Sequence, residues 1–284
     1  MASLKIIKKR ITSVKSTQKI TRAMKLVSAA KLRRASEKAH SSRPFEEELK
    51  SMVSTILNEI EWSSPLTMAR PVKKMAAIIC ATDRGLCGSL NANNFKAALR
   101  ILNQKRASGI EVEVVALGKK AGEFFRKNGF KIKSVTTDLA RKASHTLISS
   151  VASEVRKEFL SGNFDQVDVF YCRFQSALVQ KPSTFTLLPF VPPKSEEKKS
   201  FIYEPEAPEL LNQLVPMLLD FQLYRVVLEM IACEHGARMA AMESATKNSK
   251  DMIERLTLQR NRARQAAITK ELMEIIGGAE AISA

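Results

Sequence analysis

The feature that most restricts the fold is an unbroken three-and-four spacing of residues near the C-terminus. Starting from Pro208, a residue type that often opens helices, one side of the expected helix forms a single heptad seam. Its members are Leu211, Leu214, Leu218, Phe221, Arg225, Leu228, Ala232, His235, Met239, Met242, Thr246, Ser249, Ile253, Leu256, Arg260, Ala263 and Ala267. At 1.5 Å per residue a helix from Pro208 to Ile276 would be roughly 100 Å long, so it must leave its own globule.

The N-terminal region shows the same helical character. From Leu4 to about Trp62 there is no glycine and one proline, Pro44, which predicts a long helix with a kink near Arg43. The first apolar positions of its stripe are Leu4, Ile7, Ile11 and Val14. Two long helices with apolar stripes at opposite ends of one chain are expected to pair antiparallel.

Between these helices the pattern changes to alternating strands and helices. A continuous apolar run at 75–82 is the first strand candidate, and further candidates follow at 111–117, 131–135, 166–174 and 184–189. Helices are expected at 90–105, 120–128 and 140–160. The predicted class is α/β, a long antiparallel coiled coil of N- and C-terminal helices with an inserted small Rossmann-like parallel-sheet domain. The expected domains are 1–62, 72–200 and 208–284.

The basic charge is concentrated at the N-terminus. The chain has a formal net charge of +17, and residues 1–43 carry thirteen Lys and Arg against one acid, Glu37, so +12 of the total lies there. Such a segment indicates an anionic partner, either nucleic acid or an acidic protein surface, with a lipid surface less favoured. A basic coiled-coil nucleic-acid-binding protein is therefore an alternative, although few aromatics and no known nucleic-acid motif accompany the charge.

Catalysis by this chain alone is not expected. The four cysteines form no C-x-x-C pair, and three scattered histidines supply neither a metal site nor a nucleophile and base. The loop 82–91 contains G-x-x-G, which meets neither phosphate-binding fingerprint and favours a structural turn. The acidic run Glu46–Glu48 is interpreted as solvated, and His235 as a packed or partner-facing side chain. We expect no cofactor, free thiols in a reducing compartment, and no membrane span.

Three blocks of sequence together resemble a known family. They are LKIIKKRITSVKSTQKITRAMKLVSAAKLRRA at the start, TDRGLCGSLNANNF in the middle and ARMAAMESATKNSKDMIERLTLQRNRARQAAITKELMEIIGGAEA at the end. This order is similar to that of the gamma subunit of bacterial F-type ATP synthases over essentially the whole chain. The spacing Ile268-Thr269-x-Glu271-x-x-Glu274-x-x-x-Gly278-Ala279 resembles the family signature. Residues 1–36 are basic and almost free of acids, which is also typical of a mitochondrial transit peptide. The opening block resembles the start of the family's mature proteins, however, so we do not expect a transit peptide.

The resemblance implies a non-catalytic rotor shaft in the central stalk. In this family the two terminal helices lie inside a ring of alpha and beta subunits, with catalysis on beta, and the α/β insert contacts epsilon and the c ring. Ion-driven rotation is thereby coupled to ATP synthesis and hydrolysis. The implied location is peripheral, on the cytoplasmic face of the bacterial inner membrane, with membrane association through the c ring, and no nucleic acid is implied.

The same resemblance implies which residues contact these partners. The residues expected to couple to beta are Met24, Lys25, Arg238, Arg264, Gln265, Thr269 and Glu271. Those expected near epsilon and the c ring are Tyr203 and Glu204. Because the cysteine-bearing insert of chloroplast gamma subunits is absent, no thiol control is expected.

Overall fold

The computed structural model describes residues 4–191 and 203–283, which divide into two compact units. Unit 1 combines Met1–Val27 with Met239–Ala284, and unit 2 is Ser28–Arg238. Two helices contribute residues to both units: α1, Leu4–Ser41, and α7, Ala207–Ser283, which is 77 residues long. The long helix expected from the heptad seam is therefore confirmed, and Pro216 lies inside it.

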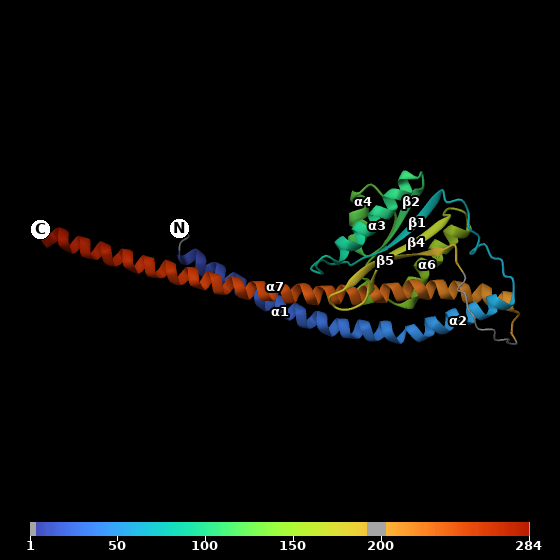
Figure 1. The fold of residues 1–284 in the computed structure, drawn as a ribbon, viewed down its shortest axis with the longest axis horizontal. Helices are drawn as coiled ribbons and strands as arrows, with labels where there is room; N and C mark the ends of the chain where they lie inside the picture. The colour runs from blue at the N-terminus through green and yellow to red at the C-terminus, as the bar shows by residue number, and fades with distance from the viewer. Residues whose placement is uncertain (1–3, 192–202, 284) are drawn as a thin grey trace. The chain divides into compact units, whose positions relative to one another are not determined.

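Unit 2 is built around one five-stranded sheet (Figure 1). Its strands are β1 (Lys74–Cys80), β2 (Glu111–Leu117), β3 (Lys131–Thr136), β4 (Gln166–Phe174) and β5 (Gln180–Leu188). They lie in the order β3-β2-β1-β4-β5, and all neighbouring pairs are parallel except β4 and β5. The predicted α/β class with a mostly parallel sheet is confirmed, and its last strand turns back as an antiparallel edge.

The central strand is covered on both faces, which explains its continuous apolar run. Met75, Ala77 and Ile79 pack in a core with α3 (Leu90–Ala107) and α4 (Lys119–Lys127). The alternate residues of β1 pack in the core that also contains residues of α2 (Arg43–Glu59), α6 (His145–Leu160) and α7. Gly236 of α7 approaches the β4–β5 hairpin closely, since a Cβ there would lie 3.2 Å from Ala177 Cα.

Two predicted helices are each divided in the structure. The N-terminal helix is interrupted at Ser42, and Pro44 lies in the first turn of α2, where its missing N–H removes no helical hydrogen bond. The helix expected at 140–160 is instead the short α5, Leu139–Lys142, followed by α6. Ser144 caps the start of α6, because its hydroxyl accepts a hydrogen bond from the Leu147 N–H at 3.2 Å. The prediction of a single helix, with Ser144 in its interior, is therefore wrong.

A buried ion cluster joins α2 to α7 in unit 2. Glu46 is only 4% exposed, so the prediction of a solvated Glu46–Glu48 run is wrong at this position, whereas Glu47 and Glu48 are exposed. The Arg225 guanidinium pairs with the Glu46 carboxylate and, at 2.5 Å, with that of Glu229. Arg225 is one of the predicted seam positions. Its guanidinium is shared between two buried carboxylates.

Within the described residues, no helix is long and apolar enough to cross a membrane.

Replacing Arg225 tests this cluster. Arg225→Met should lower the free energy of unfolding by about 3 kcal/mol, because it leaves two buried carboxylates without their shared cation. Urea unfolding can be followed by the fluorescence of Trp62, the only tryptophan, which packs against the same core. The matched control is Lys50→Met, since Lys50 pairs with Glu46 from a half-exposed position, and removal of such a pair should cost about 1 kcal/mol or less. Equal effects of both variants would show that the buried cluster contributes no more than a surface pair.

Candidate functional site

Unit 1 carries a concave basic surface formed by α1 and α7. This surface, here called the cationic groove, has a volume of about 540 Å³. Its lining residues are Gln18, Lys19, Arg22 and Lys25 of α1 and Glu243, Thr246, Lys247 and Lys250 of α7. Five cations face one carboxylate, so the groove suits an acidic partner surface.

The residues that pair the two helices show that they run antiparallel. The Lys25 ammonium lies 2.6 Å from the Glu243 carboxylate, and the hydroxyls of Thr21 and Thr246 are 2.8 Å apart. Later positions of α1 thus meet earlier positions of α7, as predicted for the coiled coil. The Thr21 hydroxyl also lies 3.1 Å from the Gln18 carbonyl and the Thr246 hydroxyl 2.7 Å from the Met242 carbonyl, so either hydroxyl can donate to the other.

An apolar cluster continues this pairing towards the start of α1. Ile7, Ile11 and Leu256 are buried together, and Val14 and Ala263 pack against them. These are the positions that the three-and-four spacing predicted. The ion pair adds little stability because both of its side chains are partly exposed. Helix pairing in unit 1 therefore depends mainly on this apolar seam.

The residues predicted to couple to a partner at the groove fall in different units. Met24 is half-buried and neighbours Lys25 in unit 1. Arg238 belongs to unit 2, where its guanidinium pairs with Glu234 at 2.7 Å and donates to the Gly85 carbonyl at 3.3 Å. The intramolecular contacts of Arg238 bind α7 to the loop 82–91.

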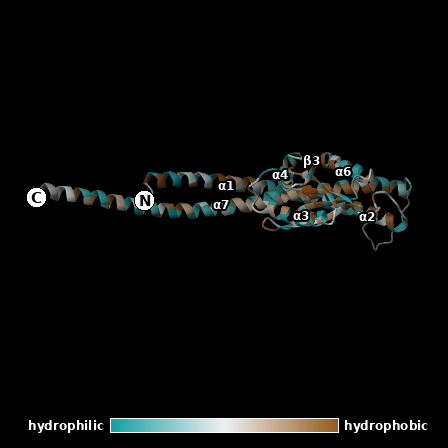
Figure 2. Cartoon of the chain, turned by 90° about the horizontal axis from the view of Figure 1, so that it is seen from above, coloured by the Kyte–Doolittle hydropathy of each residue, from teal (hydrophilic) through white to brown (hydrophobic). Residues whose placement is uncertain are grey.

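Residues 264–278 of α7, here called the exposed end of α7, are all exposed in unit 1. Its predicted contact residues are Arg264, Gln265, Thr269 and Glu271, and all four are exposed. Their side chains make no hydrogen bond or ion pair with any residue that the structure describes. Figure 2 shows α7 continuing past the start of α1, so α1 cannot cover this segment. Large apolar side chains are exposed there too: Ile268, Leu272, Met273, Ile275 and Ile276.

The predicted site at Tyr203 and Glu204 lies in unit 2. The Tyr203 hydroxyl donates to the Glu59 carboxylate at 2.7 Å. Desolvation and this hydrogen bond to a carboxylate together raise the pKa of Tyr203 to about 12. Glu204 is exposed. The phenol therefore fixes the chain next to α2, and the carboxylate is available to a partner.

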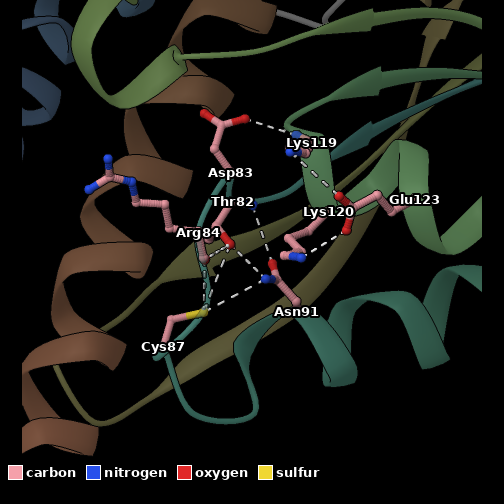
Figure 3. Close-up of polar contacts among 8 residues, drawn as sticks. All are labelled: Thr82, Asp83, Arg84, Cys87, Asn91, Lys119, Lys120 and Glu123. Atoms are coloured by element: carbon pink, nitrogen blue, oxygen red, sulfur yellow. Dashed lines mark hydrogen bonds and ion pairs between the residues drawn. The ribbon is translucent and has the colours of Figure 1, made fainter.

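The loop 82–91 is held by its own polar groups (Figure 3). The Asn91 amide donates to the Thr82 hydroxyl at 2.6 Å, and that hydroxyl donates to the Arg84 carbonyl at 2.7 Å. The Asp83 carboxylate accepts a hydrogen bond from the Lys119 backbone N–H at 2.8 Å. It thereby stabilises the N-terminus of α4. Groups that could have met a phosphate are engaged within the protein, which supports interpretation of this loop as a structural turn.

The cysteines and histidines form no recognisable reactive set in the described part of the chain. Cys80, Cys87, Cys172 and Cys233 are free, and all four are buried. Burial raises the pKa of Cys172 to about 12 and keeps its thiol protonated. Within residues 4–191 and 203–283, no group of three or more His, Cys, Asp or Glu residues is arranged to hold a metal ion.

A cross-link tests the helix register in unit 1. Because the hydroxyls of Thr21 and Thr246 touch, Thr21→Cys with Thr246→Cys should form a disulfide rapidly in mild oxidant. The four native thiols are buried and should not compete. The matched control joins Thr246→Cys to Lys15→Cys, an exposed position of the same helix, and should remain reduced. Equal cross-linking of both pairs, measured by mass spectrometry, would contradict this register.

Comparison with known proteins shows the family. A family model described as ATP synthase matches residues 3–282. The ATP synthase gamma chain of Geobacter metallireducens is 45% identical, with 99% of each chain covered, and that of Pelotomaculum thermopropionicum is 42% identical, with 99% of this chain and 100% of the relative covered.

Solved structures show the same fold. A chain of the Euglena gracilis mitochondrial ATP synthase has a TM-score of 0.72 at 20% identity, covering 98% of this chain and 94% of that one. A chain of the Tetrahymena thermophila mitochondrial ATP synthase central stalk and c ring has a TM-score of 0.59 at 20% identity, covering 80% and 99%. These comparisons give no support to the nucleic-acid alternative. From the full-length relatives and the family model together, the chain belongs to the family of ATP synthase gamma chains.

Proposed function

We propose that this chain is the central rotor shaft of an F-type ATP synthase. In this role it couples ion-driven rotation of the c ring to conformational cycling of the catalytic beta subunits, for both ATP synthesis and hydrolysis. The observation that carries the proposal is full-length similarity to gamma chains at 45% identity. The exposed end of α7 supports it, because a helix bearing exposed Leu272, Met273 and Ile276 is suited to a surrounding partner.

The asymmetry of the helix pair provides the coupling mechanism. A single shaft inside a threefold ring contacts each beta subunit differently, so each rotation angle favours a different beta conformation. The coupling is reciprocal: if one shaft angle stabilises a given beta conformation, that beta conformation stabilises the same shaft angle. Rotation can thus drive ATP release, and hydrolysis can drive rotation in reverse.

The cationic groove is the surface that we assign to beta. Lys25 and Met24 would meet an acidic segment of beta, and the excess of cations over carboxylates in the groove supports that assignment. The Lys25 and Glu243 side chains are partly exposed, so a partner carboxylate can compete for Lys25 at low cost. Arg238 would also contact beta, although its guanidinium pairs with Glu234 in this chain.

The remaining contact residues are assigned to two further surfaces. Arg264 and Gln265, with Thr269 and Glu271 further along the helix, would hydrogen-bond to a loop of beta. Tyr203 and Glu204 would lie near epsilon and the c ring, where the anchored phenol of Tyr203 positions the exposed carboxylate of Glu204.

Catalysis is assigned to the beta subunits rather than to this chain. The alpha and beta subunits would form the ring, and epsilon with the c ring would complete the rotor. The chain would then lie at the cytoplasmic face of the bacterial inner membrane and associate with it through the c ring. The resemblance of the whole sequence to bacterial gamma chains supports this location.

Co-purification tests the proposed role. Tagged full-length chain, expressed in cells that contain the other subunits, should bring down alpha and beta together with ATPase activity. The tag alone serves as the control. Recovery of the folded chain without alpha, beta or ATPase activity would contradict the proposal.

Substitution of the exposed end of α7 tests the assigned contacts. Arg264→Ala or Gln265→Ala should lower ATP turnover of the purified complex about tenfold, the order expected for loss of one hydrogen bond that involves a charged group. Assembly should persist, because neither side chain contributes to packing within the described chain. The matched control is Lys270→Ala, whose exposed ammonium pairs with Glu274 of its own helix. Unchanged turnover in the Arg264 and Gln265 variants would contradict their assignment.

A further inference from the structure

Unit 2 contains a second basic concavity that no role described above uses. It has a volume of about 280 Å³ and lies between α1, the α5 region and α7. We call it the basic pocket. Lys31, Arg34 and Lys38 line it from one side of α1, and Arg141 lines it from α5. Among the described residues that line it, there is no Asp or Glu, and four cations surround one small volume.

Most of these cations are not neutralised inside the protein. The side chains of Lys31, Arg34 and Arg141 form no ion pair with the residues that the structure describes. The Lys38 ammonium has only a long contact of 3.4 Å to the Ala143 carbonyl and lies 5.7 Å from the centre of the Tyr224 ring. Grouping like charges without a counter-ion costs free energy, and a bound anion would offset that cost.

His235 contributes a neutral donor to the same pocket. Its side chain lines the pocket although the residue is only 5% exposed. The Arg238 guanidinium, which can only donate, lies 3.5 Å from His235 Nδ1. Nδ1 is therefore the acceptor, and Nε2 carries the proton. Burial, with the nearby Arg238 and Lys31 charges, lowers the pKa of His235 to about 4, so the ring stays neutral at pH 7.

The Nε2–H of His235 has no acceptor within the described residues. Because His235 lines the pocket, this N–H can donate to a ligand oxygen in place of water. The pocket thus combines flexible cations at its rim with one fixed neutral donor. This donor set suits an oxyanion that has several acceptor oxygens.

The basic pocket has room for a small oxyanion. Its volume of about 280 Å³ suits a phosphate or pyrophosphate group. We propose that the basic pocket binds the phosphate group of a small anion, with the cations of α1 and Arg141 around it and His235 Nε2–H as a neutral donor.

Calorimetric titration of the full-length chain tests this proposal. Sodium pyrophosphate, inorganic phosphate and magnesium-free ATP are the three phosphate probes, and sodium glutamate is the carboxylate control. Pyrophosphate should bind at one saturable site, and glutamate should not saturate. Comparison of the dissociation constants of pyrophosphate and ATP shows which class of ligand the pocket prefers. Tighter binding of pyrophosphate indicates a free phosphate, tighter binding of ATP indicates a nucleotide, and both results support the site.

Paired charge variants separate the pocket from general attraction to a basic chain. Lys31→Gln with Arg34→Gln should weaken pyrophosphate binding at least about tenfold, as expected when charge-assisted hydrogen bonds are lost. Lys8→Gln with Arg10→Gln removes the same charge from exposed positions of unit 1 and should change the dissociation constant less than about twofold at moderate salt. Absence of saturable pyrophosphate binding, or equal weakening by both pairs, would overturn the proposal.

Substitution of His235 tests the neutral donor. His235→Phe removes the donor with little change in volume and should weaken pyrophosphate binding, whereas His235→Gln offers an amide N–H and should retain most of it. Circular dichroism confirms that each variant is folded. Because Lys31 and Arg34 are exposed, their variant remains informative if His235→Phe does not fold. Equal affinity of folded His235→Phe and the unmodified chain would overturn the role of His235.

Discussion

The antiparallel contact between α1 and α7 in unit 1 is the interaction on which the account depends. Its buried apolar cluster consists of Ile7, Ile11 and Leu256. Each such side chain stabilises the pairing by about 1.5–3 kcal/mol, whereas the partly exposed pair of Lys25 with Glu243 contributes about 1 kcal/mol or less. The hydrogen bond between Thr21 and Thr246 fixes the register more than it adds stability. A narrow seam of this kind leaves most of both helix surfaces available to other chains.

The exposed surface explains the unusual charge of the sequence. A rotating shaft must make and break contacts with three successive sites, and polar contacts of about 1 kcal/mol or less can exchange without a large barrier. The cationic groove offers such contacts through four lysines and one arginine. In contrast, unit 2 pairs its buried charges within the chain, as in the cluster around Arg225. The exposed cations of the basic pocket, by contrast, form no ion pair within the described residues, which is why we assign that pocket a ligand.

Local patterns in the sequence were sufficient to locate the long C-terminal helix and most of the sheet. The heptad seam predicted α7, and the apolar run at 75–82 predicted the central strand because both of its faces are buried. Long-range partners were not predictable in this way. Glu46 looked solvated beside Glu47, since its partner Arg225 is far along the chain, and Ser144 looked helical because its capping role requires a backbone break. Contacts with other chains, such as those proposed for Arg264 and Gln265, leave no pattern within one sequence, so only the family resemblance suggested them.

The most direct test of the central claim uses the helix pair as one rotating body. Complexes assembled with Thr21→Cys and Thr246→Cys in this chain should show ATP-driven rotation in single-molecule recordings at similar rates before and after oxidation. The disulfide joins two helices of the same shaft, so it should not obstruct rotation against the ring. Rotation that stops on oxidation and resumes on reduction would contradict the account, because it would mean that α1 and α7 must slide past each other during the cycle.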